Sequence, residues 1–301
     1  MTAHSVILGD WGGTRLRLWL RQGGATIAAS EAPGLLVANE SPEQILRHAL
    51  GSLGVTAPLP IVLCGMAGAR EGLAEAGYVP CPGNVDQWVG AAVETSLDGF
   101  PITILPGFSN RDGGGRPDVM RGEEAQVFGA LTMRHAGANG PTEMVLPGTH
   151  SKWVRVEDCS ISHFATCPTG ELHASLLGSS LAPRERQTHS RSHADGFSTG
   201  VARAFDGVPL MASLFEARAA RVLDHRDGDW SAGFLSGLLI GSEIAAMAPS
   251  CALNAVPLLV GSDDLVRRYR SAFAKYGLDC QTADGETCAL IGLEIAYAQL
   301  G

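Results

Sequence analysis

The feature that most constrains this fold is a strand, glycine turn and strand that occurs twice in the chain. Residues 6–20 read VILGDWGGTRLRLWL: an apolar run ends at Asp10, two glycines follow, and leucine then alternates with arginine and tryptophan, which is the period of a half-buried strand. Residues 143–156, EMVLPGTHSKWVRV, follow the same plan, and aligning Leu146 with Leu8 brings both turns into register. A duplication at a separation of about 140 residues predicts two similar halves.

The first turn has the composition of a phosphate site. Gly12 and Gly13 lack a Cβ, so their backbone N–H groups can converge on phosphate oxygens. Asp10 beside them would repel a phosphate unless a cation lay between the two, which is the arrangement of a bound Mg-nucleotide. A plain Gly-Gly hairpin with a surface aspartate would produce the same sequence.

Composition excludes several classes of protein. A chain of 301 residues with 45% hydrophobic content can bury a core, as one large domain or two ordinary ones. The net charge of -9 argues against a nucleic-acid partner, although local arginines leave room for a small anionic substrate. Seven scattered cysteines without a C-x-x-C pair favour reduced thiols over zinc or disulfides. Without an export segment or an apolar run of transmembrane length, we expect a soluble cytoplasmic protein with no membrane partner.

Strands and helices alternate along the chain, which predicts an α/β fold with mixed sheets. We expect further strands near residues 25–30, 60–64, 102–105, 256–260 and 279–282, and helices near 42–53, 122–135, 201–205, 210–223, 231–247, 263–276 and 287–300, with another helix opening at Thr169. The run Ser41-Pro42-Glu43-Gln44 predicts a capping box. Gly233, Gly237 and Gly241 share one helix face, which favours close helix packing.

Three polar stretches lack the periodicity of packed structure. Residues 107–119, GFSNRDGGGRPDV, and residues 183–196 are too polar to pack, so we expect exposed loops there. Residues 136–142, AGANGPT, have the composition of a domain boundary.

Seven motifs, in order along almost the whole chain, resemble the 2-dehydro-3-deoxygalactonokinase family. They are DWGGTRLRLWL (10–20), GMAGAREG (65–72), DVMRGEEAQVFGAL (118–131), LPGTHSKWV (146–154), TGELHASL (169–176), FLSGLLIGSEI (234–244) and LLVGSDDL (258–265). The resemblance implies a two-domain, actin-like (ribonuclease H-like) ATPase fold, in which mixed β-sheets flanked by helices form domains 1–138 and 139–301 on either side of a cleft. It also implies transfer of the ATP γ-phosphoryl group to the 6-hydroxyl of 2-dehydro-3-deoxy-D-galactonate, with Mg²⁺, in galactonate catabolism. It leaves room for a homodimer.

The same resemblance assigns the nucleotide site. The first phosphate hairpin of the superfamily falls on Asp10, Gly12, Gly13 and Thr14, the second on Gly148, Thr149, His150, Ser151 and Lys152, and the adenosine segment on Val260, Gly261 and Ser262. Gly148 stands where the superfamily often has an aspartate, so Asp10 is the expected carboxylate for Mg²⁺, through water. Lys152 is placed to reach a β- or γ-phosphate oxygen as a point charge, or it is an ordinary solvated lysine.

Three carboxylates compete for the role of catalytic base, namely Asp118, Glu123 and Glu124. Sugar kinases of the superfamily carry their catalytic acid at the equivalent helix start, and Asp118 most resembles the Asp-before-helix layout. Adjacent helical residues point about 100° apart, so Glu123 and Glu124 cannot both face a cleft. Glu124 heads the apolar stripe, where burial would raise its pKa toward a useful value. Both glutamates would equally complement the helix dipole without any catalytic role.

A 2-keto acid substrate has a carboxylate that requires a cationic partner. Arg70 is the first candidate, with Arg111 and Arg121 behind it, although any of them could be a surface arginine. Glu171 in TGELH is a further substrate candidate, and His173 is another through the adjacent Thr169 and Glu171, although a lone helical histidine is more often structural. Two other functions stay open: a phosphohydrolase of the same superfamily, because Glu123-Glu124-Ala125 resembles a segment of exopolyphosphatases, and a non-catalytic nucleotide-binding regulator. A kinase for a related 2-keto-3-deoxy sugar acid is the nearest alternative to the galactonate enzyme.

Overall fold

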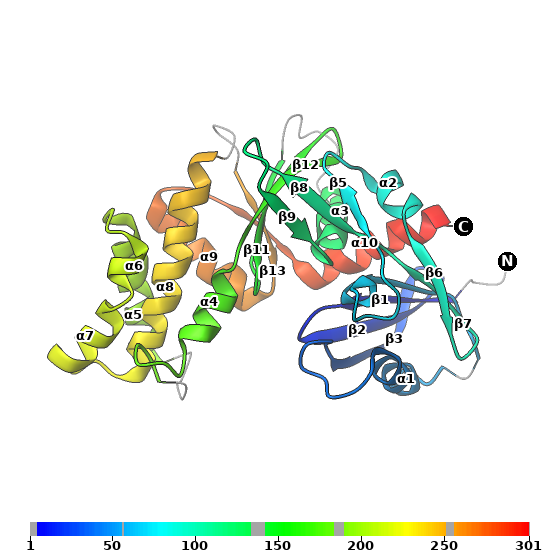
Figure 1. Cartoon of the computed structure of the whole chain (residues 1–301), viewed down its shortest axis with the longest axis horizontal. Helices are drawn as coiled ribbons and strands as arrows, with labels where there is room; N and C mark the ends of the chain where they lie inside the picture. Colours follow the sequence, from blue (N-terminus) through cyan, green and yellow to red (C-terminus); the bar gives the residue numbers. More distant parts are fainter. Residues whose placement is uncertain (1–4, 56, 134–141, 184–189, 251–255, 301) are drawn as a thin grey trace. The chain divides into compact units, whose positions relative to one another are not determined.

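The computed structural model describes residues 5–55, 57–133, 142–183, 190–250 and 256–300 (Figure 1). The chain divides into two compact units: the first contains Met1–Gly140, Arg155–Phe164 and Asp284–Gly301, and the second contains Pro141–Val154 and Ala165–Ala283. The predicted boundary at residues 136–142 lies almost entirely outside the described residues. The division into domains 1–138 and 139–301 stays a prediction.

The first unit is built on a six-stranded mixed sheet in the order β3-β2-β1-β4-β7-β6. Its strands are β1 (Ser5–Trp11), β2 (Arg15–Gln22), β3 (Ala25–Pro33), β4 (Ile61–Gly65), β6 (Val93–Leu97) and β7 (Phe100–Ile104). β1 pairs antiparallel with β2 and parallel with β4, so that Asp10 lies opposite Arg17 on one side and Cys64 on the other. The predicted hairpin and buried parallel strands are therefore confirmed.

Local sequence signals account for the helices of this unit. α1 (Pro42–Ser52) begins with the predicted capping box, in which Ser41 and Gln44 each accept a hydrogen bond from the other's backbone amide. α3 (Glu123–Met133) packs against α10 (Gly285–Leu300). A Cβ on Gly129 would lie 1.8 Å from the Cys288 carbonyl oxygen, so the two helices approach closely only because that position is a glycine. The short helix α2 (Val85–Gly90) was not predicted.

Residues 107–119 differ from the prediction of an exposed loop. They form most of a β-hairpin, β8 (Gly107–Arg111) and β9 (Pro117–Met120), which joins β5 (Tyr78–Pro80) in a three-stranded sheet. The glycines and charges belong to the turn, whereas Phe108 and Met120 face each other across the hairpin and are fully buried. Alternate burial of these few apolar residues outweighs the polar average of the segment.

The second sheet follows the plan of the first. Its order is β12-β11-β10-β13-β14, with β10 (Thr142–Leu146), β11 (Ser151–Glu157), β12 (Ser160–Cys167), β13 (Leu258–Gly261) and β14 (Gln281–Asp284). Each sheet contains a three-stranded meander, β1-β2-β3 in the first and β10-β11-β12 in the second. In each, the first strand of the meander pairs on its other side with a parallel strand, β4 beside β1 and β13 beside β10. The sequence repeat thus corresponds to a repeated topology.

The helices of the second unit are α4 (Thr169–Leu176), α5 (Arg191–Phe205), α6 (Leu210–Ser213), α7 (Glu216–Leu223), α8 (Gly228–Met247) and α9 (Asp263–Tyr276), with a 3₁₀ turn η2 (Ala248–Ser250) after α8. The loop predicted at residues 183–196 is wrong from residue 191 onward, where α5 begins with Ser190 as its N-cap, and residues 184–189 lie outside the described part. The helix predicted over 210–223 is divided into α6 and α7.

The glycines of α8 pack as predicted. A Cβ on Gly233 or on Gly237 would lie 2.1 Å from a backbone oxygen of α5, and the two helices lie side by side in Figure 1. By length and composition α8 could cross a membrane, although no apolar run of that length was identified in the sequence. Because 78% of its most apolar window is buried within the protein, α8 has the character of a core helix.

Candidate functional site

Asp10 is the penultimate residue of β1, is buried, and is held by its neighbours. Its side chain accepts a hydrogen bond at 2.5 Å from Arg17 Nη2, and Arg17 Nη1 also lies 3.2 Å from Glu286 on α10. Cys64 Sγ lies 3.8 Å from Asp10 Oδ1. Burial raises the pKa of the Cys64 thiol well above its usual value, and the charges of Asp10 and Glu124 add to the effect. Asp10, Cys64 and Glu124 therefore belong to one acidic centre in the first unit.

The first turn uses one of its two glycine amides internally. Gly12 N–H donates to the Arg15 carbonyl at 2.8 Å and closes the hairpin, while the Gly13 carbonyl accepts from Leu36 N–H at 2.8 Å. The amide of Gly12 is thus committed to the turn, and those of Gly13 and the exposed Thr14 are the better candidates for a phosphate.

Glu124 is the most unusual of the three candidate acids. It is fully buried at the start of α3, and both of its carboxyl oxygens lie within 2.9 Å of the Gly122 amide nitrogen. Burial raises its pKa to about 8, with the neighbouring charge of Glu123 acting in the same direction. A Cβ on Gly122 would lie 4.0 Å from Asp10 Oδ1. The elevated pKa expected for Glu124 is confirmed, and its anchoring turn lies beside Asp10.

The other two candidate acids lie in more open surroundings. Asp118 is half-buried on β9, opposite Asn110, and its Oδ1 accepts from the backbone amide of Val119 at 2.8 Å. Glu123 is half-buried and accepts from the Arg121 amide at 3.2 Å. Burial thus separates Glu124 from both alternatives.

The turn of the second hairpin packs against the start of α4. A Cβ on Gly170 would lie 2.4 Å from the Gly148 carbonyl oxygen, and Glu171 N–H donates to the Thr149 carbonyl at 2.9 Å. The Glu171 carboxylate lies 2.7 Å from His150 Nε2. The turn is therefore fixed by the helix that follows β12.

Lys152, just past this turn, is only 4% exposed. Its Nζ lies 3.5 Å from the His150 carbonyl oxygen. The alternative of an ordinary solvated lysine is therefore wrong, and a buried ammonium group next to a glycine turn is suited to an anionic ligand.

A buried carboxylate, Glu243 on α8, was missed as a site residue although it lies in the motif FLSGLLIGSEI. Trp153 Nε1 donates to Oε1 at 2.8 Å and Tyr269 OH donates to Oε2 at 2.7 Å; the Thr169 hydroxyl also donates to Oε2. Ser151 Oγ, predicted to bind phosphate, is fully buried and lies 2.7 Å from Tyr269 OH. Burial raises the pKa of Glu243. An acid within the apolar stretch FLSGLLIGSEI of α8 was the available sequence signal.

The candidate substrate residues have varied surroundings. Arg70 has a side chain 81% exposed, 3.9 Å from Glu75. Arg121 donates to the Ala76 carbonyl at 2.6 Å and stacks on the Tyr78 ring at 4.3 Å. Other candidates contact backbone carbonyls: Arg111 that of Gly115, and His173 that of Ala232.

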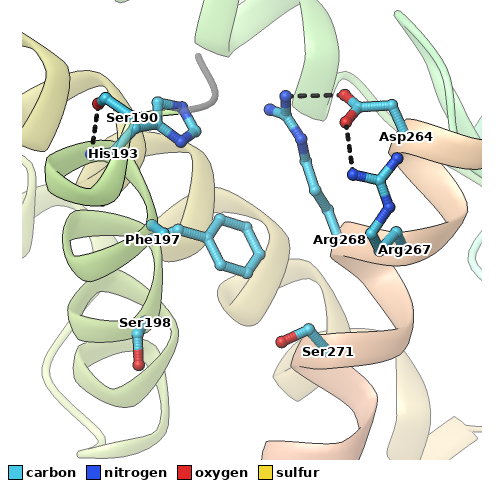
Figure 2. Close-up of a pocket in the computed structure, with 9 residues that line it drawn as sticks. Ser190, His193, Phe197, Ser198, Asp264, Arg267, Arg268 and Ser271 are labelled. Atoms are coloured by element: carbon cyan, nitrogen blue, oxygen red, sulfur yellow. Dashed lines mark hydrogen bonds and ion pairs between the residues drawn. The ribbon is translucent and has the colours of Figure 1, made fainter. Parts of the chain in front are cut away.

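A cavity of about 340 Å³ lies between α5 and α9. Figure 2 shows the Phe197 ring projecting from α5 into this space, opposite Arg267 and Arg268 of α9, which both pair with Asp264. Ser262, the exposed N-cap of α9, and Gly261 at the buried end of β13 lie just before Asp264 in the chain. The cavity therefore lies on the helix that follows the predicted adenosine segment. Within the described residues, no group of three or more histidines, cysteines or acids is placed to hold a metal ion.

Comparison with known proteins agrees with the motifs. The sequence profile of the 2-keto-3-deoxy-galactonokinase family matches residues 10–296. A probable 2-dehydro-3-deoxygalactonokinase of Rhizobium meliloti is 38% identical over 95% of this chain and 94% of its own length, and the 2-dehydro-3-deoxygalactonokinase of Escherichia coli is 35% identical over 99% of both chains.

Solved structures agree on the fold. A crystal structure of a similarly named Sinorhizobium meliloti protein has a TM-score of 0.84 at 34% identity, covering 99% of both chains. Component A of the (R)-2-hydroxyglutaryl-CoA dehydratase of Acidaminococcus fermentans has a TM-score of 0.54 at 11% identity, covering 99% of this chain and all of its own. The fold is mixed α/β and similar to the actin-like ATPase fold, as expected.

Proposed function

This chain belongs to the 2-keto-3-deoxy-galactonokinase family, and we propose from this its reaction. The protein transfers the γ-phosphoryl group of ATP to the 6-hydroxyl of 2-dehydro-3-deoxy-D-galactonate in galactonate catabolism. The observation that carries this proposal is the family match over residues 10–296, together with full-length relatives at 35% and 38% identity. The acidic centre around Asp10 and the two glycine turns supply the kinds of group that phosphoryl transfer requires.

The phosphates of ATP are assigned to the two turns. In the first turn we assign phosphate binding to the Gly13 and Thr14 amides. In the second we assign it to residues 148–152, where Lys152 would supply a positive charge. A Mg²⁺ ion fits the first turn through Asp10, because magnesium commonly binds one carboxylate together with substrate phosphates and water. The carboxylate is suitable in chemistry, although Arg17 holds one of its oxygens. When bound, the ion neutralises phosphate charge.

Glu124 is the proposed general base. A carboxyl group with a pKa near 8 is a strong enough base to accept the proton of the sugar hydroxyl as the new O–P bond forms. Its anchoring turn at Gly122 adjoins Asp10, the proposed magnesium carboxylate, which supports this choice of base. Asp118 and Glu123 are the alternatives, and both are only half-buried.

The nucleoside is assigned to the cavity between α5 and α9, whose lining includes Asp264, two residues after Ser262 in the chain. Its volume of about 340 Å³ is within the usual range for a small-molecule site, roughly 300–1,000 Å³. Phe197 and the planar guanidinium of Arg268 are suited to contact with an aromatic base.

The substrate carboxylate is assigned to the cationic groups of the first unit. Arg121 immediately precedes Gly122 in the chain, and Arg70 is exposed enough to move to a ligand. Glu171 is kept as a substrate candidate through its pairing with His150. The six cysteines that the structure describes are free thiols, which supports the proposal of a reducing, cytoplasmic location.

The test is incubation of the purified protein with Mg·ATP and 2-dehydro-3-deoxygalactonate, followed by ³¹P NMR. A phosphomonoester on the sugar supports the kinase. Orthophosphate formed without sugar supports the phosphohydrolase, and nucleotide binding without either product supports the regulator. Parallel assays with the gluco epimer and other 2-keto-3-deoxy sugar acids identify the preferred substrate, and a phosphorylated product only with one of those would replace the galactonate assignment.

A further inference from the structure

A connected set of buried polar side chains adjoins the second hairpin turn. It consists of Ser151, Trp153, Thr169, Glu243 and Tyr269, which we call the Glu243 network. Glu243 is 5% exposed and accepts hydrogen bonds from Trp153, Thr169 and Tyr269, and the Tyr269 hydroxyl lies 2.7 Å from Ser151 Oγ. These side chains come from β11, α4, α8 and α9. One carboxyl group thus joins four elements of the second unit.

Two members of the network flank the turn itself. Ser151 begins β11 immediately after the turn, and Thr169 begins α4. The residues after Thr169 hold the turn directly: Gly170 packs on the Gly148 carbonyl, and Glu171 N–H bonds to the Thr149 carbonyl. Glu243 is therefore connected to both segments that fix the turn, the strand that leaves it and the helix that packs on it.

Packing alone does not account for this arrangement. Replacing a buried polar group and its partners with apolar residues of similar volume is commonly neutral or stabilising, so stability does not require an acid here. Directional hydrogen bonds, in contrast, fix the positions of Thr169 and Ser151 relative to each other. Burial also raises the pKa of Glu243, which limits negative charge close to a turn assigned to phosphates.

We propose that Glu243 is a positioning residue for the nucleotide phosphates, because it connects Thr169, at the start of the helix that packs on the turn at residues 148–150, with Ser151, at the start of the strand that leaves this turn. This inference rests on the proposed assignment of that turn to ATP. Glu243 does not contact the phosphates; it acts through the backbone that does. Of the hydrogen bonds that connect Glu243 to the turn, the one from the Thr169 hydroxyl is the easiest to remove, because valine has a side-chain volume similar to that of threonine.

The experiment measures Mg·ADP affinity by isothermal titration calorimetry for the wild type, Thr169→Val, Glu243→Gln and Ser231→Ala. Ser231 is a matched control, because it is a fully buried hydroxyl on the same helix, bonded to the Ala217 carbonyl at 3.1 Å and outside the network. Steady-state KM values for ATP and for the sugar acid are measured alongside, and circular dichroism verifies folding.

Thr169→Val is expected to weaken Mg·ADP binding about tenfold and to raise the KM for ATP in parallel, because the turn loses one directional link. The KM for the sugar acid should change less than about twofold. Glu243→Gln is expected to keep most of the affinity, since its amide accepts from Trp153 and donates to the two hydroxyls. Ser231→Ala should leave affinity unchanged.

The inference is overturned if Thr169→Val binds Mg·ADP as the wild type does, or if Ser231→Ala weakens binding equally. It is also overturned if the sugar KM alone responds. A wild type that itself binds no Mg·ADP shows instead that the nucleotide assignment is wrong. That result differs from a failure of the positioning role alone, in which the wild type binds Mg·ADP. If Thr169→Val does not fold, the Mg·ADP affinities of Glu243→Gln and Glu243→Leu are compared instead. Equal affinities of these two variants contradict a positioning role.

Discussion

Glu124 in the first unit and Glu243 in the second are both carboxyl groups buried on helices, and burial raises the pKa of both. Their partners differ. The oxygens of Glu124 meet the Gly122 amide and stand beside a second acid, Glu123, whereas those of Glu243 receive three side-chain donors. A carboxyl group whose oxygens accept hydrogen bonds from several side chains is held in one position. A carboxyl group that contacts only backbone and lies beside another acid gains or loses its proton more easily.

The comparison teaches that burial and a raised pKa do not by themselves identify a catalytic acid. The partners decide, because a base must be able to change protonation during turnover. On this criterion we propose Glu124 as the reactive carboxyl group and Glu243 as the positioning one. The two turns also differ in where their acid lies. The first has Asp10 two residues before Gly12, whereas the second has Pro147 and Gly148 at that place, and its acid is Glu243 on α8, far away in the sequence.

The largest expected effect is on turnover. Glu124→Gln should lower kcat about 10²- to 10⁴-fold, because general base catalysis typically contributes that much, whereas Glu243→Gln should lower it less than about threefold. Steady-state kinetics with saturating ATP and sugar acid measure both. Asp118→Asn and Glu123→Gln are the matched alternatives. If one of these loses activity while Glu124→Gln retains it, the assignment of the base moves to that residue.

Stability should respond in the opposite order. Glu243→Leu leaves three buried donors without an acceptor and should lower the free energy of unfolding by about 3 kcal/mol or more. Glu124→Leu removes partners mainly from backbone amides and should cost about 1–2 kcal/mol. Urea unfolding followed by circular dichroism measures both variants. Equal losses would contradict the difference in partners on which the comparison is based.

Features governed by neighbouring residues could be predicted from the sequence. The two hairpins, the capping box at Ser41 and the glycine spacing of α8 are local patterns, and each is present in the structure. The hairpin over residues 107–119 was missed because its turn, rich in glycine and charge, dominates the composition, while Phe108 and Met120 alone carry its buried face.

The site was less accessible to sequence reasoning, because its contacts join distant residues. Glu243 meets Thr169 across 74 positions, and Arg17 meets Glu286 across 269. No local period encodes such pairs. Motif position did identify Glu124 as a residue whose burial raises its pKa, since its place at the head of an apolar helix stripe is itself a local pattern.

The pH dependence of stability should reveal Glu124 directly. In the folded protein its pKa is about 8, above its ordinary value of 4.5, so between these values the unfolded chain loses the proton while the folded protein keeps it. The free energy of unfolding should therefore fall as pH rises through this window, by at most about 1.4 kcal/mol per pH unit from this group. Glu124→Gln should flatten that slope in urea titrations at pH 5.5, 6.5 and 7.5. An unchanged slope would mean that Glu124 ionises normally in the folded protein.

The smallest effect is expected for Tyr269→Phe. The hydroxyl joins Ser151 to Glu243, with 2.7 Å on either side, and its loss removes one of the three donors to Glu243 while Trp153 and Thr169 remain. The free energy of unfolding should fall by about 1 kcal/mol, because a single hydrogen bond typically contributes that much. Tyr276→Phe on the same helix is the control and should change stability by less than about 0.5 kcal/mol. If the two variants lose equally, the Tyr269 hydroxyl adds nothing beyond the packing of its ring, and the link from Glu243 to the second turn then passes through Thr169 alone.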